Sequence, residues 1–202
     1  MGTDIHLFAE KKNSDLDWEH VPVEVPYDGR NYKLFSILAG VRNWGGFAGC
    51  DTGNPLIPIA GPRGLPEDVS VFVQKESNAW GNGAHSHSWL TLQEMLNYNW
   101  DQLAVLRGIV TQASFSEFLC NAVPNSYCGN VWGPSIKMLS NAEMQYRVKN
   151  NVPADENCYT KIEWTRTYRE CAKEFYDTVI PWLQNYANGD PSGIRLVFWF
   201  DS

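Results

Sequence analysis

The chain has 202 residues, and its 16 Lys and Arg against 23 Asp and Glu give a net charge of −7. This length suits one ordinary domain, or one domain with an insertion. The negative charge argues against a protein that holds duplex nucleic acid by releasing counterions from its phosphates. Nine Trp, nine Tyr and nine Phe supply enough apolar area for a sizeable core, which argues against intrinsic disorder.

The pattern of apolar residues gives no sign of a membrane segment. No apolar run approaches the roughly 20 residues that span a bilayer. The N-terminus lacks a basic region followed by a hydrophobic stretch, so we expect neither a signal peptide nor membrane association. The five cysteines are an odd number without a Cys-x-x-Cys pair, which fits free thiols in a reducing cytoplasm: Cys50, Cys120, Cys128, Cys158 and Cys171.

Three segments have the pattern of β-strands. Residues 4–11 alternate between apolar and polar side chains, as in a strand with one buried face. Residues 18–21 follow a polar turn and are a plausible hairpin partner. Residues 194–200 are almost continuously apolar, which predicts a strand in the middle of a sheet covered on both faces.

Other segments have helical spacing. Residues 32–42 carry apolar side chains at helical intervals after Asn31, a suitable N-cap. Thr91 and Glu94 have the spacing of a capping box. The apolar residues of 103–110 and 115–119 also suggest helix, and residues 141–149 are a further candidate helix.

The clearest helix is predicted over residues 164–186, with a kink or break at Pro181. Residues 158–164 fit either a short strand or the approach to that helix. Together these elements predict an α+β fold: a single domain over residues 1–202, in which the first and last strands share a sheet and helices pack on it. Residues 101–157 are a candidate insertion.

Asp4 and His6 are the first candidate site residues. Two residues apart on a strand, their side chains leave the same face with Cβ atoms about 7 Å apart. This separation suits two ligands of one metal, or an aspartate that orients a histidine through another group. An exposed edge-strand face, or a buried histidine bonded to a backbone carbonyl, would give the same pattern.

The second candidate is the segment from His85 to Trp89, which precedes a capped helix. In extended backbone, His85 and His87 would be able to share a metal. Backbone amides at the helix start, the hydroxyls of Ser86 and Ser88, and the face of Trp89 would suit an anionic or ring-bearing ligand. The alternative is a well-bonded loop with serine as a cap and tryptophan as core.

These two segments hold three of the four histidines. If they converge, Asp4, His6, His85 and His87 offer mixed nitrogen and oxygen ligands of the kind that zinc, manganese or iron accepts. The same four residues would then supply the acid and base groups of a metal-assisted reaction. The sequence therefore suggests a divalent metal, Zn²⁺ or Mn²⁺, whose site depends on that convergence.

Arginines beside glycine-rich segments form the third candidate. Arg30 precedes Asn31 and Tyr32, Arg42 ends the same predicted helix, and Arg63 lies further along. Arginine suits two-pronged contacts with carboxylate or phosphate, so these side chains would be able to form an anion pocket. Each arginine would equally be able to pair with a nearby acid, among them Asp28, Asp51 and Glu67.

Five segments in this order resemble a family of small uncharacterised proteins of bacteriophage and prophage genomes. They are Met1–His6, Arg30–Asn43, Gly64–Ser70, His85–Leu92 and Arg195–Asp201. The resemblance covers roughly residues 1–98 and 160–202 and leaves residues 101–157 unmatched. It implies a phage origin and action in the host bacterial cytoplasm, but it supplies no activity, ligand or site residue.

Three functions are compatible with these residues. The first is a phage accessory protein whose polar pocket binds a small anionic, nucleotide-like molecule, with metal-assisted hydrolysis of that molecule as a further step. The second is a non-catalytic binder that sequesters such a ligand or inhibits a host protein. The third is a structural or interaction protein in which the polar residues only fix loops.

Overall fold

The structure of the chain is a computed structural model that describes residues 2–43 and 50–201. It divides into two compact units. The first takes in the described residues of the ranges 1–43, 56–102 and 168–202, and the second those of 44–55 and 103–167. The expectation of a single domain with an insertion over 101–157 stays a prediction.

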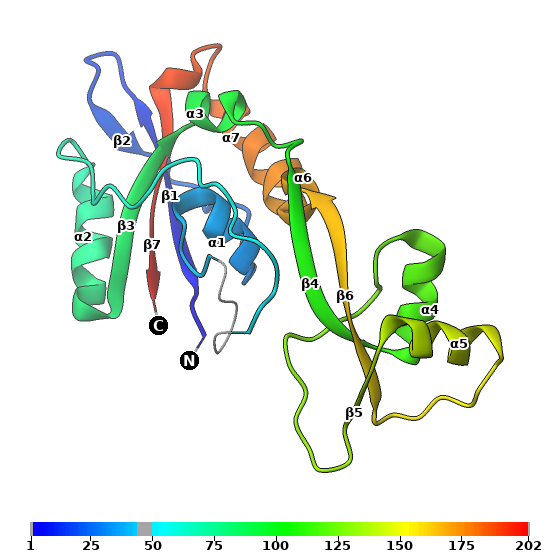
Figure 1. Cartoon of the computed structure of the whole chain (residues 1–202). Helices are drawn as coiled ribbons and strands as arrows, with labels where there is room; N and C mark the ends of the chain where they lie inside the picture. The colour runs from blue at the N-terminus through cyan, green and yellow to red at the C-terminus, as the bar shows by residue number, and fades with distance from the viewer. Residues whose placement is uncertain (1, 44–49, 202) are drawn as a thin grey trace. The chain divides into compact units, whose positions relative to one another are not determined.

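The first unit is built on a four-stranded antiparallel sheet (Figure 1). Its strands are ordered β2 (Trp18–His20), β1 (Ile5–Lys12), β7 (Ile194–Asp201) and β3 (Ala84–Thr91). The α+β class is thus confirmed, with the first and last strands of the chain paired in one sheet. Strand β7 lies between β1 and β3, and its residues 194–200 are all buried, as the apolar run predicts.

Helices cover this sheet on both faces. Helix α2 (Val71–Trp80) packs Val73 against Val197 and Trp199 of β7. Helix α1 (Tyr32–Ala39) covers the opposite face, where Phe35 meets the ring of Phe200 at 5.1 Å between centroids. Consecutive residues of β7 therefore alternate between two apolar layers, which explains why the strand carries no polar face.

The predicted helix caps of the first unit are present. The side chain of Asn31 accepts hydrogen bonds from the amides of Lys33 and Leu34, and α1 ends at Gly40, which has a φ of 70°. Because left-handed backbone is open to glycine without strain, Gly40 is a suitable stop. Helix α3 (Leu92–Asn97) begins with a complete capping box.

The predicted helix over residues 164–186 is shorter and interrupted. Residue 164 belongs to a strand, and the helical region starts with α6 (Tyr168–Cys171). A π-helical turn, Phe175–Val179, then precedes α7 (Ile180–Tyr186), and the amide of Ile180 donates to the carbonyl of Phe175. Pro181 stands in the first turn of α7, so the expected break at this proline is confirmed as a π turn.

The second unit has a three-stranded sheet ordered β4 (Leu103–Thr111), β6 (Cys158–Thr167) and β5 (Lys137–Leu139). Helices α4 (Gln112–Asn121) and α5 (Asn141–Lys149) accompany it. The prediction of helix over 103–110 is wrong, because these residues pair with β6 along their whole length. The candidate helices over 115–119 and 141–149 are confirmed.

Candidate functional site

A groove of about 710 Å³ runs along β1 in the first unit. The groove is lined by six consecutive residues, Asp4 to Ala9, and by residues of the segment 22–29. Successive residues of a strand point to opposite faces of its sheet. Because residues from both faces line the same groove, it follows the edge of β1 rather than either face of the sheet.

This edge of β1 is open because β2 is short. Strand β2 pairs only with Glu10–Lys12, and the last bond on this side runs from the Val21 amide to the carbonyl of Ala9. In an antiparallel strand, alternate residues direct their backbone groups to opposite neighbours. Ile5 and Leu7 share the direction of Ala9, and no hydrogen bond between described residues engages their backbone N–H and C=O groups.

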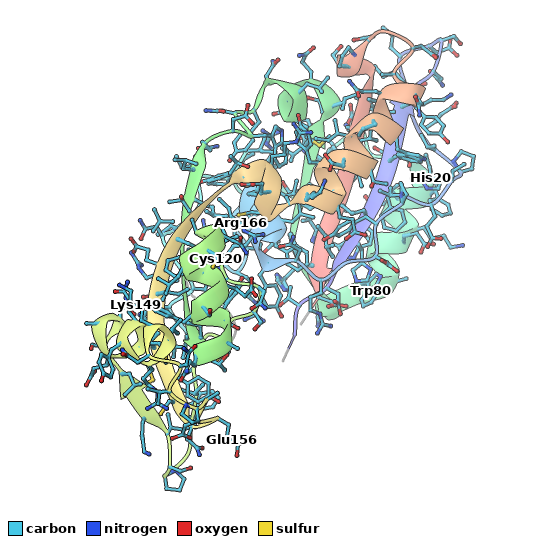
Figure 2. The ribbon with its side chains drawn as sticks, turned by 90° about the vertical axis from the view of Figure 1, so that its right-hand side faces the viewer. His20, Trp80, Cys120, Lys149, Glu156 and Arg166 are labelled. Atoms are coloured by element: carbon cyan, nitrogen blue, oxygen red, sulfur yellow. The ribbon has the colours of Figure 1, made fainter. Side chains whose placement is uncertain are left out.

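Aromatic side chains stand on one side of the groove. The ring of His20 stacks on Phe72 with centroids 4.0 Å apart, and both residues line the groove. Trp80, at the end of α2, lies outside the lining, and its ring centroid is 4.1 Å from that of His6 (Figure 2). The hydroxyl of Tyr27, in the opposite wall, is buried without a hydrogen-bond partner among the described residues. The groove is thus mostly apolar, and its polar side chains include His6, His20 and Tyr27.

The charged residues of the groove are acidic. Its lining contains Asp4, Glu24 and Asp28, and no Lys or Arg. Asp4 is compensated by Arg30, whose Nε and Nη2 donate to its two carboxylate oxygens at 2.7 and 2.5 Å. These hydrogen bonds lower the pKa of Asp4 below its usual value. No ion pair between described residues engages Glu24 or Asp28, so the groove has a negative potential.

The Asp4 end of the groove carries a hydrogen-bonded network. Asp201, the last residue of β7, accepts from the backbone amide of Asp4 at 3.0 Å and lies 3.1 Å from Nε2 of His6. Asp201 therefore joins the two residues of the first predicted motif through its two carboxylate oxygens. The carboxylate placed to orient His6 is therefore that of Asp201 and not that of Asp4, which is paired with Arg30. Asp201 was missed because only the register of β1 against β7 reveals it.

The candidate residues in and beside α1 lie at the same end of the sheet. Arg42 donates from Nε to the hydroxyl of Thr3 at 2.8 Å and lies over the ring of Tyr32. The amide of Thr3 donates to the Tyr32 hydroxyl at 3.3 Å. The Asn31 side chain caps α1 through its oxygen and donates from its nitrogen to the carbonyl of Cys171. Arg30, Tyr32 and Arg42 thus surround the start of β1.

His85 and His87 lie on opposite faces of the sheet. They belong to β3, whose register against β7 shifts between His85 and Ser88, and Ser86 has a φ of 53°. This bulge directs His85 toward Phe200 and His87 toward Trp199. His87 is hydrogen-bonded to the Ser77 hydroxyl at 2.9 Å, and burial lowers its pKa.

Arg63, Ser88 and Trp89 lie away from the groove. Arg63 pairs with Glu94 at 2.6 Å and stands over the ring of Trp89, beside the start of β7. The Ser88 hydroxyl is buried and donates to the carbonyl of Gly61. The three candidate arginines are therefore divided, with Arg30 and Arg42 at one end of the sheet and Arg63 at the other.

The four proposed metal ligands have other neighbours. The Asp4 carboxylate is ion-paired with Arg30, and the His6 ring is hydrogen-bonded to Asp201. The two histidines of β3 lie on opposite faces of the sheet. Within residues 2–43 and 50–201, no group of three or more His, Cys, Asp or Glu is placed to hold a metal ion. Binding of zinc or manganese stays a prediction.

Comparisons with protein-family models, with curated proteins and with solved structures find no significant match. In the part of the chain that the structure describes, no helix is both long and apolar enough to cross a bilayer.

Proposed function

We propose that this protein is a non-catalytic binding protein, which takes an extended segment of a partner protein into the groove along β1. The observation that carries the proposal is the open edge of β1 inside a groove of about 710 Å³. A bare strand edge offers backbone donors and acceptors in a regular row, and peptides bind such edges by adding a strand.

The dimensions of the groove suit a short peptide. The six residues from Asp4 to Ala9 extend over about 20 Å at the rise of a strand, which matches about six residues of an added strand. Backbone bonds to Ile5 and Leu7 would supply affinity, and the groove walls would select alternate side chains. This geometry favours an extended chain over a compact small molecule.

The lining specifies the chemistry of the segment. The lining presents the aromatic rings of Phe8 and Phe72 and the aliphatic side chains of Val23 and Val25. Glu24 and Asp28 add negative charge without a compensating cation in the lining. The expected partner segment is therefore apolar at alternate positions and carries Lys or Arg between them.

The partner would be a host protein if the chain has the phage origin that the resemblance implies. In that case the two proteins would meet in the host cytoplasm. The hydrolysis of a nucleotide-like ligand has less support, because Arg30 and Arg63 each pair with a carboxylate and stand at opposite ends of the sheet.

Hydrogen exchange on the free protein tests the open edge first. The amides of Ile5 and Leu7 are expected to exchange quickly, whereas those of His6 and Phe8, which face β7, are expected to be protected. These interleaved residues are matched controls within one strand. Equal protection of all four amides would show that the edge is closed and would contradict the proposal.

Binding is then measured with synthetic octapeptides in which Val alternates with Lys, or Val with Glu. The Lys peptide is expected to bind and to slow the exchange of Ile5 and Leu7, whereas the Glu peptide is not. Methylating the amide nitrogens of alternate residues should abolish binding in one of the two registers only. Binding that survives methylation in both registers would exclude strand addition.

A pair of variants locates the peptide. Val23→Lys places a positive charge in the groove wall, where it replaces an apolar contact and repels the Lys peptide, and Val71→Lys places the same charge on an exposed position of α2 outside the lining. Val23→Lys should weaken binding at least tenfold, and Val71→Lys should leave it unchanged. Equal effects of the two variants would show that the peptide binds elsewhere.

A further inference from the structure

The two ends of the groove along β1 differ. At one end β2 already occupies the edge of β1, because His20 pairs with Glu10 there. At the other end the lining stops at Asp4, whose ion pair with Arg30 is about half exposed to solvent. Figure 1 shows β2 at the end of β1 that lies away from the N-terminus. A peptide in the groove therefore meets β2 at one end and solvent at the other.

The end beside β2 is closed by the chain itself. Val21 is 1% exposed and holds the position opposite Ala9, to whose carbonyl its amide donates at 2.9 Å. The Val23 amide then donates to the carbonyl of Val21 at 2.7 Å, in a three-residue turn around Pro22. A strand added in the groove lies in line with β2, since both pair with the same edge. At this end its outermost residue stands opposite Phe8.

A closed end favours a chain terminus over an internal segment. An internal segment would have to continue past Val21 or turn out of the groove directly after its last backbone bond. Either path would cost it some of the six positions from Asp4 to Ala9 that line the groove. A terminal segment stops at Val21 and keeps its backbone bonds to Ile5 and Leu7. The partner segment is therefore expected to contain a chain end.

The direction of the strands selects the amino end. Every strand pair of this sheet is antiparallel, and antiparallel pairing is slightly more stable per residue than parallel pairing. Strand β2 runs toward the Asp4 end of the groove, from Trp18 opposite Lys12 to His20 opposite Glu10. An added strand antiparallel to β1 runs in the same direction as β2. Its amino end therefore lies at the closed end of the groove.

The charge of the lining selects the same end. Among the described residues, no Lys or Arg lines the groove to bind a terminal carboxylate. Glu24 follows directly after the turn around Pro22 and supplies a negative charge near the closed end. Burial lowers the pKa of His20, so this ring is uncharged at pH 7 and does not repel a cation. A terminal ammonium is therefore favoured over a terminal carboxylate.

We propose that the groove takes the amino-terminal segment of its partner. The segment lies antiparallel to β1, with its first residue opposite Phe8 and its chain leaving at the Asp4 end. This inference rests on the proposed function and adds to it the class of segment and its direction.

Extended peptides test which end is closed. The reference is the octapeptide of alternating Val and Lys, with Val first, a free amino end and an amidated carboxyl end. Adding Gly-Ser-Gly-Ser to its carboxyl end should leave the Kd unchanged in calorimetric titration of the folded protein. Adding the same residues to its amino end should weaken binding at least tenfold. The two extended peptides have the same composition and charge, so each is the matched control of the other.

Nuclear Overhauser effects test the direction. Directly opposite residues of paired strands share a face of the sheet, so the first side chain should lie beside Phe8. The ring of Phe8 is 6.1 Å from that of His20. Leu in place of the first Val should therefore show contacts from its methyl groups to the His20 ring and none to the His6 ring. Contacts to His6 alone would show the reverse direction and contradict the inference.

Two results of the titrations would also overturn the inference. Equal binding of the two extended peptides would show that the end beside β2 is open. Tighter binding of the peptide extended at its amino end would show that a carboxyl end enters the groove. Both results would leave the proposed function standing, because a peptide still binds. Failure of the reference octapeptide to bind would overturn the proposed function, and this inference with it.

Discussion

Glu10 and Arg195 stand directly opposite each other in β1 and β7 and form an ion pair that is closed to solvent. Glu10 is 0% exposed and Arg195 is 2% exposed. The second carboxylate oxygen of Glu10 accepts from the amide of Ser70, the N-cap residue of α2. The pair therefore links both strands to the helix that covers them.

Removing one partner of this pair should be strongly destabilising. Arg195→Met leaves the Glu10 carboxylate buried without its cation, and we expect a loss of about 3–5 kcal/mol in the free energy of unfolding. Urea denaturation followed by circular dichroism measures it. The double variant Glu10→Met, Arg195→Met should recover much of that loss. A single variant that costs less than about 1 kcal/mol would show that the carboxylate is solvated or protonated.

The capping box of α3 is a second target. Thr91→Ala removes the hydroxyl that accepts from the Glu94 amide at 3.1 Å, and it should cost about 1 kcal/mol. Thr91→Ser keeps the hydroxyl and is the matched control. Thermal unfolding should rank the unmodified protein and Thr91→Ser together, above Thr91→Ala. Equal losses in both variants would assign the effect to the missing methyl group.

The bulge at Ser86 gives a prediction about backbone strain. A non-glycine residue with a φ of 53° is held in left-handed backbone, which costs about 1–2 kcal/mol relative to its ordinary conformations. Ser86→Ala and Ser86→Gly both lose the hydroxyl that bonds to His85, and only glycine relieves the strain. Ser86→Gly should therefore unfold at a higher temperature than Ser86→Ala. The reverse order would show that Ser86 is not held in this conformation.

Two partly buried histidines make stability depend on pH. Burial lowers the pKa of His20 and His87 from the ordinary value of 6.5. Between the folded and unfolded pKa values the unfolded chain binds more protons, so stability is full above about pH 6.5 and is lost as pH falls through the folded values.

His87→Gln should flatten this dependence in part, and His20 should account for the remainder. The free energy of unfolding at pH 7.5 and pH 5 measures both contributions. An unchanged pH profile in His87→Gln would mean that the imidazole titrates alike in the folded and unfolded chain.

Much of the first unit follows from local patterns. Three local patterns each predict one element: the alternation in β1, the Asn31 cap of α1 and the apolar run of β7. Each pattern involves only residues that are neighbours in the sequence. Residues 103–110 show where this fails. Their apolar spacing fits a helix and a strand equally, and the β-branched Val105, Ile109 and Val110 were the sign of a strand.

The candidate site was harder to predict because it depends on register. Asp4 and His6 were found from their spacing, but Asp201 reaches them only through the pairing of β1 with β7. A regular strand places residues two positions apart on the same face, and the sequence gives no sign of the bulge at Ser86. The two histidines of β3 were therefore expected on one face. The open edge of β1 exists because β2 ends early, which no residue of β1 itself encodes.

The shift of register in β3 has a practical use. His85 contacts Phe200 beneath α1, whereas His87 contacts Trp199 beneath α2, although only one residue separates them in sequence. Their imidazole proton resonances are thus two independent spectroscopic reporters, one for each layer of the fold. A structural change confined to one layer would alter the chemical shift of one of these histidines and leave that of the other unchanged.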